Sequence, residues 1–141
     1  MSDQNYRLLY CSRNEIHGAV AQVSEAVQQI LVSARLNNSR FGITGALLFN
    51  EGLFAQWLEG PRDAVVKAFE AISRDPRHSN VMVLESGMQG GRRFPDWSMA
   101  FASPSDRPSF ESIAPVFEEA FANAPMGAQG ILTLLHRILT V

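Results

Sequence analysis

The sequence is poor in the features that mark several large protein classes. It contains one cysteine, Cys11, which excludes an internal disulfide and a cysteine-based zinc site. The formal net charge is -2 at pH 7, so no general positive field attracts nucleic acid or anionic lipid. It also lacks an apolar run long enough for a signal peptide or a membrane-spanning helix. We therefore expect a cytoplasmic protein without nucleic-acid or membrane partners.

Histidine is also scarce, and it is scattered. His17, His78 and His136 are far apart in the sequence, and none has a cysteine or carboxylate at ligand spacing on a shared helix. We therefore expect no metal site.

What the sequence does contain is enough apolar material for one core. Of its 141 residues, 46% are hydrophobic and 18% are charged, as in an ordinary soluble domain. We expect a domain over residues 1–103 and a helical appendage over residues 104–141. The apolar arc between Ile131 and Leu139 is wider than one packing contact needs, which suggests packing on the sheet, a second copy of the chain or a partner protein.

The stretch 42–60 predicts two central antiparallel strands, about 44–49 and 53–59, around a tight turn. Alternation along the second strand places Gln56 between Phe54 and Leu58 on one face, and Trp57 and Glu59 on the other. An unpaired buried carboxamide costs about 1–3 kcal/mol. Gln56 must therefore find hydrogen-bond partners, either in the protein or on a bound ligand.

The remaining elements follow from apolar periodicity and from turn residues. They give the order β-α-β-β-α-β-β, which predicts an α+β, ferredoxin-like fold with two helices on one face of a mixed sheet and two C-terminal helices on the other. The further elements are a strand at 6–11, a helix from near Ala19 or Ser24 that stops at 37–39 followed by Gly42, a helix from 60–61 to 75–76, a strand at 81–86 followed by an interruption or bulge at 87–91, and a strand at 97–101.

This topology brings three polar side chains toward one crevice. Tyr10 and Gln56 lie on neighbouring central strands, and Asn38 lies at the end of the first helix. A phenol, two carboxamides and an apolar slot suit a flat ring that carries both donors and acceptors. Each residue alone has a common structural use, such as asparagine as a helix stop, so the prediction depends on their combination.

The sequence resembles the BLUF domain family, the flavin-binding blue-light sensors of bacteria, over residues 6–102. The resemblance rests on five ordered motifs, which are YRLLYCSR around Tyr10, NNSRFGITGALLF around Asn38, FAQWLEGP around Gln56, RDPRHSN from Arg74, and RRFPDWSM ending at Met99. It implies the ferredoxin-like fold that the periodicity also predicts.

The resemblance further implies a cofactor and roles for individual residues. The cofactor is FAD, with FMN as the alternative. Tyr10 is implied to be the photochemical electron and proton donor, and Gln56 to bridge Tyr10 to N5 and the C4 carbonyl of the flavin. The other implied cofactor-binding residues are Ile30, Asn37, Asn38, Asp75, Arg77, His78, Trp97 and Met99. The family often carries a cation near position 71, where this chain has alanine, so Arg40, Arg74 or Arg77 is expected to hold any phosphate.

The function implied by the resemblance is a non-enzymatic light sensor, expected to be a homo-oligomer, that signals to a separate partner protein. Two other functions fit the same topology. One is a small acylphosphatase-like hydrolase, against which stands the lack of a glycine-rich phosphate loop beside an arginine. The other is an RNA-binding sheet, which needs exposed aromatics and a basic face that the sequence does not show.

Overall fold

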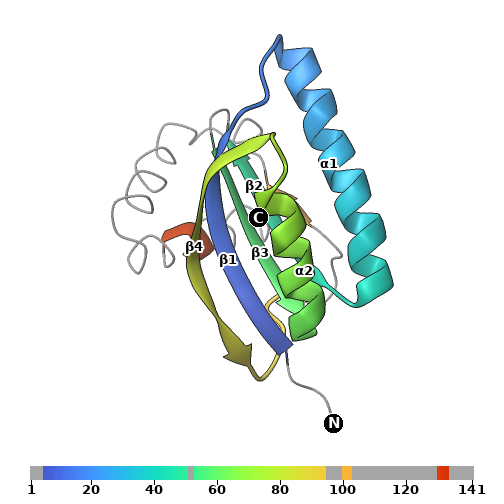
Figure 1. Ribbon diagram of the computed structural model, residues 1–141, viewed down its shortest axis with the longest axis vertical. Helices are drawn as coiled ribbons and strands as arrows, with labels where there is room; N and C mark the ends of the chain where they lie inside the picture. The colour runs from blue at the N-terminus through green and yellow to red at the C-terminus, as the bar shows by residue number, and fades with distance from the viewer. Residues whose placement is uncertain (1–4, 51–52, 95–99, 103–129, 134–141) are drawn as a thin grey trace.

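The structure, a computed structural model, describes residues 5–50, 53–94, 100–102 and 130–133. The elements are β1 (Asn5–Asn14), α1 (Val20–Phe41), β2 (Thr44–Asn50), β3 (Leu53–Gly60), α2 (Arg62–Ser73), β4 (His78–Gln89) and β5 (Ala100–Ala102) (Figure 1). The sheet order is β4-β1-β3-β2-β5, with antiparallel pairing except for the parallel β2–β5 pair. The predicted order and the α+β, ferredoxin-like class are confirmed.

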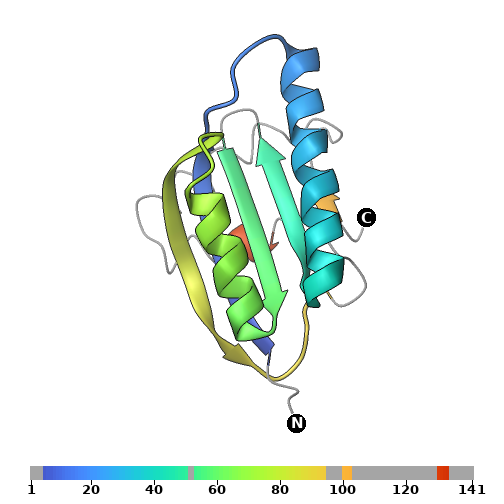
Figure 2. The ribbon, with the colours of Figure 1, turned by 45° about the vertical axis from the view of Figure 1, so that its right-hand side comes forward.

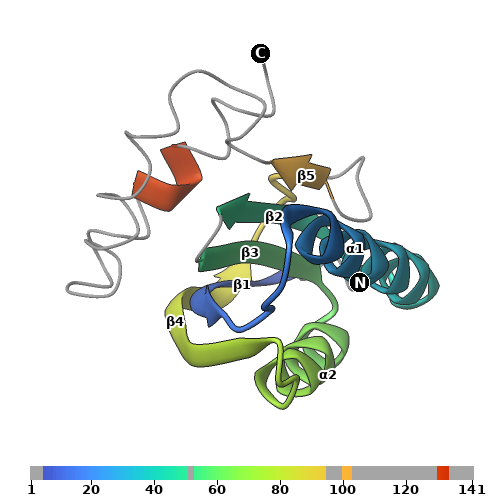
Figure 3. The same cartoon turned by 90° about the horizontal axis from the view of Figure 1, so that it is seen from above.

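Both helices pack on the same face of the sheet (Figure 3). Turned by 45°, the molecule shows β2 and β3 in the space between α1 and α2 (Figure 2). The core of this layer contains Val27 and Leu31 from α1 and Val65 from α2, packed on strand residues such as Leu8 and Leu58. The apolar spacing of three and four residues in both helices thus faces the sheet, as the periodicity predicts.

Both ends of α1 lie where one of the predicted signals placed them. The helix begins at Val20 after Ala19, which is the earlier of the two predicted starts. It continues past Asn37 and Asn38, which therefore lie in the last turn and do not stop the helix. Gly42 ends it in the left-handed conformation at φ 73°, where its N–H bonds to the Asn38 carbonyl. Glycine adopts this conformation without a Cβ penalty, so it terminates the helix more effectively than the asparagines do.

The interruption or bulge predicted at residues 87–91 was wrong for residues 87–89. β4 starts at His78 and runs through Gly87 to Gln89 while paired with β1. The irregularities lie further back, where the β1–β4 register shifts between Leu9 and Tyr10 and again between Cys11 and Arg13. Gly87 pairs in regular register opposite Arg7, and the two extra residues of β4 lie at the two register shifts.

The predicted fifth strand and appendage are described only in part. β5 covers Ala100–Ala102, and the residues before it that the sequence assigned to this strand lie outside the described part. Within the appendage, residues 130–133 are helical and lie across the sheet from α1 and α2, with Ile131 and Leu132 buried (Figure 3). Among the described helices, none is long and apolar enough to cross a membrane.

Candidate functional site

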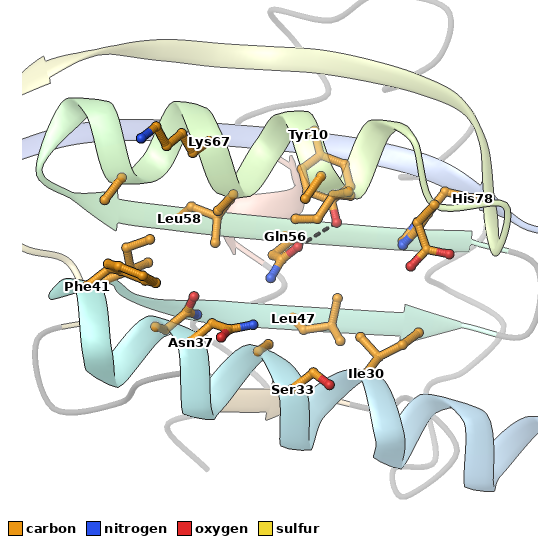
Figure 4. Close-up of a pocket in the computed structure, with 18 of the residues that line it drawn as sticks. Tyr10, Ile30, Ser33, Asn37, Phe41, Leu47, Gln56, Leu58, Lys67 and His78 are labelled. Carbon is orange, nitrogen blue, oxygen red and sulfur yellow. Dashed lines mark hydrogen bonds between the residues drawn. The ribbon is translucent and has the colours of Figure 1, made fainter.

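A cavity of about 590 Å³ lies between α1 and α2 above the central strands (Figure 4). Its volume lies in the range of about 300–1,000 Å³ that is usual for small-molecule sites. Eight of the sequence-predicted site residues line it, namely Tyr10, Ile30, Asn37, Asn38, Gln56, Asp75, Arg77 and His78. The other two, Trp97 and Met99, lie outside the described residues. The lining of this one cavity thus includes residues from four strands, both helices and the turn before β4.

Tyr10 and Gln56 meet as the sheet topology predicts. They are direct register partners on β1 and β3, and their side chains are 1% and 4% exposed. The Tyr10 hydroxyl donates a hydrogen bond of 2.5 Å to Oε1 of Gln56. This bond leaves the amide nitrogen of Gln56 directed toward the space between the helices (Figure 4). The oxygen of the carboxamide therefore accepts from the phenol, and its nitrogen lies on the cavity side.

Tyr10 is held as a neutral phenol. Burial raises the pKa of its hydroxyl far above the ordinary value, and Asp75 and Cys11 add to this effect. The ring of Phe69 lies 5.6 Å from the Tyr10 ring, between centroids. A protonated phenol can donate its hydrogen to Gln56 and retains a proton to release.

His78 is fixed by a residue that sequence reasoning missed. Nδ1 of its imidazole lies 2.8 Å from the Ser12 hydroxyl, which is fully buried. The ring also packs on Phe54, with 4.5 Å between centroids. Burial lowers the pKa of His78, which favours the neutral ring. Ser12 follows Tyr10 by two positions on β1, so strand alternation alone places it on the same face.

Asp75 and Arg77 form the one ion pair that borders the cavity within the described residues. Nε of Arg77 lies 2.9 Å from Oδ1 of Asp75, and Nη2 lies 2.5 Å from Oδ2. The hydrogen bond from Arg77 lowers the pKa of Asp75, and the same bond raises the pKa of Arg77. The charge of Arg77 is thus largely matched by Asp75.

The remaining walls combine apolar side chains with carboxamides. Asn38 is 5% exposed, whereas Asn37 is open to solvent, although both line the cavity from α1. Ile30, Leu47 and Leu58 supply apolar surface. The described lining holds no nucleophile activated by a base, and its one exposed lysine, Lys67, was not among the residues that the sequence suggested. Such walls can sandwich a flat heteroaromatic ring and bond to its edge.

The opposite face of β3 carries a second polar cluster, centred on Glu59. This carboxylate is fully buried and accepts hydrogen bonds from the Trp57 indole at 2.9 Å and from the Gln89 amide at 2.7 Å. The backbone N–H groups of Arg93 and Phe94 also donate to it, at 2.9 and 2.6 Å. The cluster holds residues 89–94 against the sheet.

Arg92 and Arg93 are structural, and neither is simply a solvated turn residue. Arg92 donates to Oδ1 of Asn5 at 3.1 Å, to the Thr44 hydroxyl at 3.1 Å and to the Gly42 carbonyl at 2.8 Å. The guanidinium of Arg93 lies 5.2 Å from the centre of the Trp57 ring. Neither arginine lines the cavity, so neither is a candidate for contact with a ligand there.

The described part of the chain contains no candidate metal centre. No group of three or more histidine, cysteine, aspartate or glutamate side chains is arranged there to hold an ion. Cys11 is buried, and burial raises the pKa of its thiol to about 11, so it is a poor metal ligand or nucleophile at neutral pH.

Comparisons with known proteins identify the family of the chain. The family profile described as "Sensors of blue-light using FAD" matches residues 6–100. The photoactivated adenylate cyclase subunit beta of Euglena longa is 34% identical over 91 residues, 64% of this chain and 11% of that protein. The blue light- and temperature-regulated antirepressor BluF of Escherichia coli K12 is 38% identical over 68 residues, 48% of this chain and 17% of that protein. The chain thus spans a small part of these relatives.

Solved structures match over the whole chain. The dark-state structure of BlrB, a BLUF protein, has a TM-score of 0.77 at 34% identity and covers 99% of this chain and 97% of its own. The ground state of BlsA has a TM-score of 0.75 at 28% identity and covers 97% of this chain and 89% of its own. None of the comparisons supports the hydrolase alternative. Cavity, fold and similarity agree, and the chain belongs to the BLUF family of flavin-binding blue-light sensors.

Proposed function

We propose that this chain senses blue light through a flavin held non-covalently in the cavity between α1 and α2, with Tyr10 and Gln56 as its photochemical residues. The observation that carries the proposal is the hydrogen bond between these two side chains at the cavity wall. It joins an electron and proton donor to an amide that can exchange its own donor and acceptor ends.

The residues of the cavity fit the cofactor that the family uses. Its volume of about 590 Å³ admits a tricyclic ring with part of its side chain. Ile30 and Leu47 would pack on the ring planes, and Asn38 would bond the polar edge. Asn37 and His78 would contact the remaining edges. The close family match favours FAD, and FMN has the same ring system.

The flavin, when bound, supplies a chromophore that becomes a strong oxidant after it absorbs blue light. Tyr10 would then give the excited flavin an electron from its ring and a proton from its hydroxyl, which already points at Gln56, and would take both back, so that neither group is changed overall. The amide of Gln56 responds by rotation or tautomerisation, because its nitrogen and oxygen ends have nearly the same shape and can exchange places without repacking Phe54 and Leu58. A new donor toward the ring's C4 carbonyl lowers the excitation energy, which predicts a red-shifted absorption.

The output of this sensor is proposed to be binding of a separate protein, without catalysis by residues 1–103. Dark and lit forms must then differ in their affinity for that partner, because light shifts the equilibrium only through such a difference. We propose that β5, with Trp97 or Met99 before it, and the appendage over residues 104–141 carry the change. The appendage is also the proposed contact between copies in a homo-oligomer.

An absorption spectrum tests this function. The purified chain should be yellow and, under blue light, should show a red shift of the flavin bands that reverses in the dark. Hydrogen exchange should then differ between dark and light at residues 100–102 and 113–140. A colourless protein that binds no added flavin would refute the proposal, whereas a photocycle without exchange differences would refute only the signalling route.

A further inference from the structure

We propose that Lys67 binds the phosphate of the flavin nucleotide, an inference that rests on the proposed flavin function. Lys67 is the only lysine in the sequence, and it lines the cavity from α2. Figure 4 places it with Phe41 toward one end of the cavity, away from His78. Neither the family match nor the sequence motifs identify this residue.

The charges around the cavity leave Lys67 as the available cation. Four charged side chains line it, namely Asp63, Lys67, Asp75 and Arg77. Arg77 is already bonded to both carboxylate oxygens of Asp75. A phosphate bound by Arg77 would have to displace this pairing and leave Asp75 without its cation, which is costly for a partly buried group.

Lys67, unlike Arg77, is not bonded to a carboxylate within the described part of the chain. It forms no hydrogen bond or salt bridge with any residue that the structure describes. Asp63 lies one helical turn earlier and lines the same cavity, yet the two side chains are not paired within 4.0 Å. Lys67 is therefore not held by the ion pair with Asp63 that a spacing of four positions on a helix would allow.

The shape of α2 also favours this position. Ala64, Ala68 and Ala71 are the lining residues nearest to Lys67 along this helix face, so the helix presents little side-chain bulk there. Arg40 and Arg74, which the sequence offered as phosphate ligands, do not line the cavity. The cation expected near position 71 is thus replaced by one a single turn earlier on the same face of α2.

The chemistry of the ligand matches an exposed ammonium. A flavin nucleotide carries its phosphate at the end of a flexible ribityl chain, so the anion must lie away from the polar edge of the ring that Gln56 and Asn38 contact. Lys67 is exposed at the rim. Lysine there keeps most of its hydration and acts as a point charge, which suits a phosphate that also remains hydrated.

The test compares two flavins that differ by the phosphate alone. The flavin-free full chain is titrated with riboflavin and with FMN at low ionic strength, and the ratio of the two dissociation constants measures what the phosphate contributes. In Lys67→Gln this preference for FMN should fall about fivefold, as expected for a charge pair near the surface. In Asp63→Asn it should rise, because a repelling carboxylate is removed. Arg74→Gln, outside the cavity, is the matched control.

Salt provides a second measurement. The difference between wild type and Lys67→Gln should shrink toward zero in about 1 M salt, where the Debye length is only about 3 Å. A preference for FMN that is equal in wild type and Lys67→Gln at low salt would overturn the assignment. If the wild type binds neither flavin, the proposed function itself fails and this inference fails with it.

Discussion

The two faces of β3 carry polar groups of similar burial that are organised in opposite ways. On the cavity face, Gln56 is 4% exposed and accepts from Tyr10, while its amide nitrogen faces a cavity. On the other face, Glu59 is fully buried and its donors come entirely from the protein. One strand thus combines an adjustable hydrogen bond with a fixed cluster.

This difference between Gln56 and Glu59 shows how a small domain can change its hydrogen bonding without losing its fold. A carboxamide exchanges donor and acceptor by rotation, whereas a carboxylate can only accept, so a cluster built on Glu59 has one stable arrangement. Trp57 lies between the two positions and donates to Glu59. The cluster on the far face therefore keeps β3 in place while the side chain on the cavity face changes partners.

The largest effect is expected on the cavity face. Gln56→Leu and Tyr10→Phe should each abolish the long-lived red shift, because each removes one side of the only described hydrogen bond between phenol and amide. Both variants should remain folded and bind flavin, as checked by circular dichroism and by the dark spectrum. A complete photocycle in either variant would exclude the proposed mechanism.

The next effect is on stability. Glu59→Ala leaves at least four donors without their acceptor. The free energy of unfolding should fall by about 3–5 kcal/mol, as for other buried charged groups whose partners remain. Urea denaturation measures this. Glu59→Gln keeps one acceptor oxygen and should cost less, and a loss below about 1 kcal/mol in Glu59→Ala would show that the cluster does not hold the sheet.

A pH dependence should follow from His78. Burial lowers its pKa below the ordinary value near 6.5, so the unfolded chain takes up a proton first as the pH falls. Stability should be full above pH 6.5 and should decline below it, by at most about 1.4 kcal/mol per pH unit, until the folded ring also protonates. His78→Phe should flatten this decline between pH 7.5 and 5.5 in denaturation experiments. An unchanged slope would contradict the burial argument.

The smallest effect is expected at the paired carboxylate of Glu85. It bonds to Nε of Arg7 at 2.7 Å, but the two side chains are 31% and 26% exposed. Solvent screens such a pair, so Glu85→Gln should change the unfolding free energy by less than about 1 kcal/mol. The same urea measurement gives the comparison with Glu59→Gln. Equal losses in both variants would mean that burial does not distinguish the two carboxylates.

The sequence predicts which face of a strand each side chain occupies, because the alternation of side chains is a local property of the chain. Alternation along residues 53–59 assigns Gln56 and Trp57 to opposite faces, and the pairing of β1 with β3 then brings Tyr10 to Gln56. The positions of Ser12 and Lys67 were available from the same periodicity. The sequence does not single them out, because a lone serine on a strand and a lone lysine on a helix have ordinary structural uses.

Other features depended on distances that no local pattern contains. β4 was expected to be interrupted or bulged at residues 87–91, but it stays paired with β1 as far as Gln89. The partners of Arg92 and Arg93 could not be predicted, because nothing near these arginines in the sequence indicates Asn5, Thr44 or Trp57. The binding roles of the cavity residues stay predictions until flavin binding is measured.

The sequence by itself determined the order of the elements, the faces of the strands and the family, because periodicity and motifs are properties of neighbouring positions. Only the tertiary structure decided which charged and polar groups are already paired, since pairing depends on how the backbone turns and on which separate segments it brings together. It matched Arg77 to Asp75, enclosed Glu59 among donors from residues 57, 89, 93 and 94, and left Lys67 at the rim of the cavity.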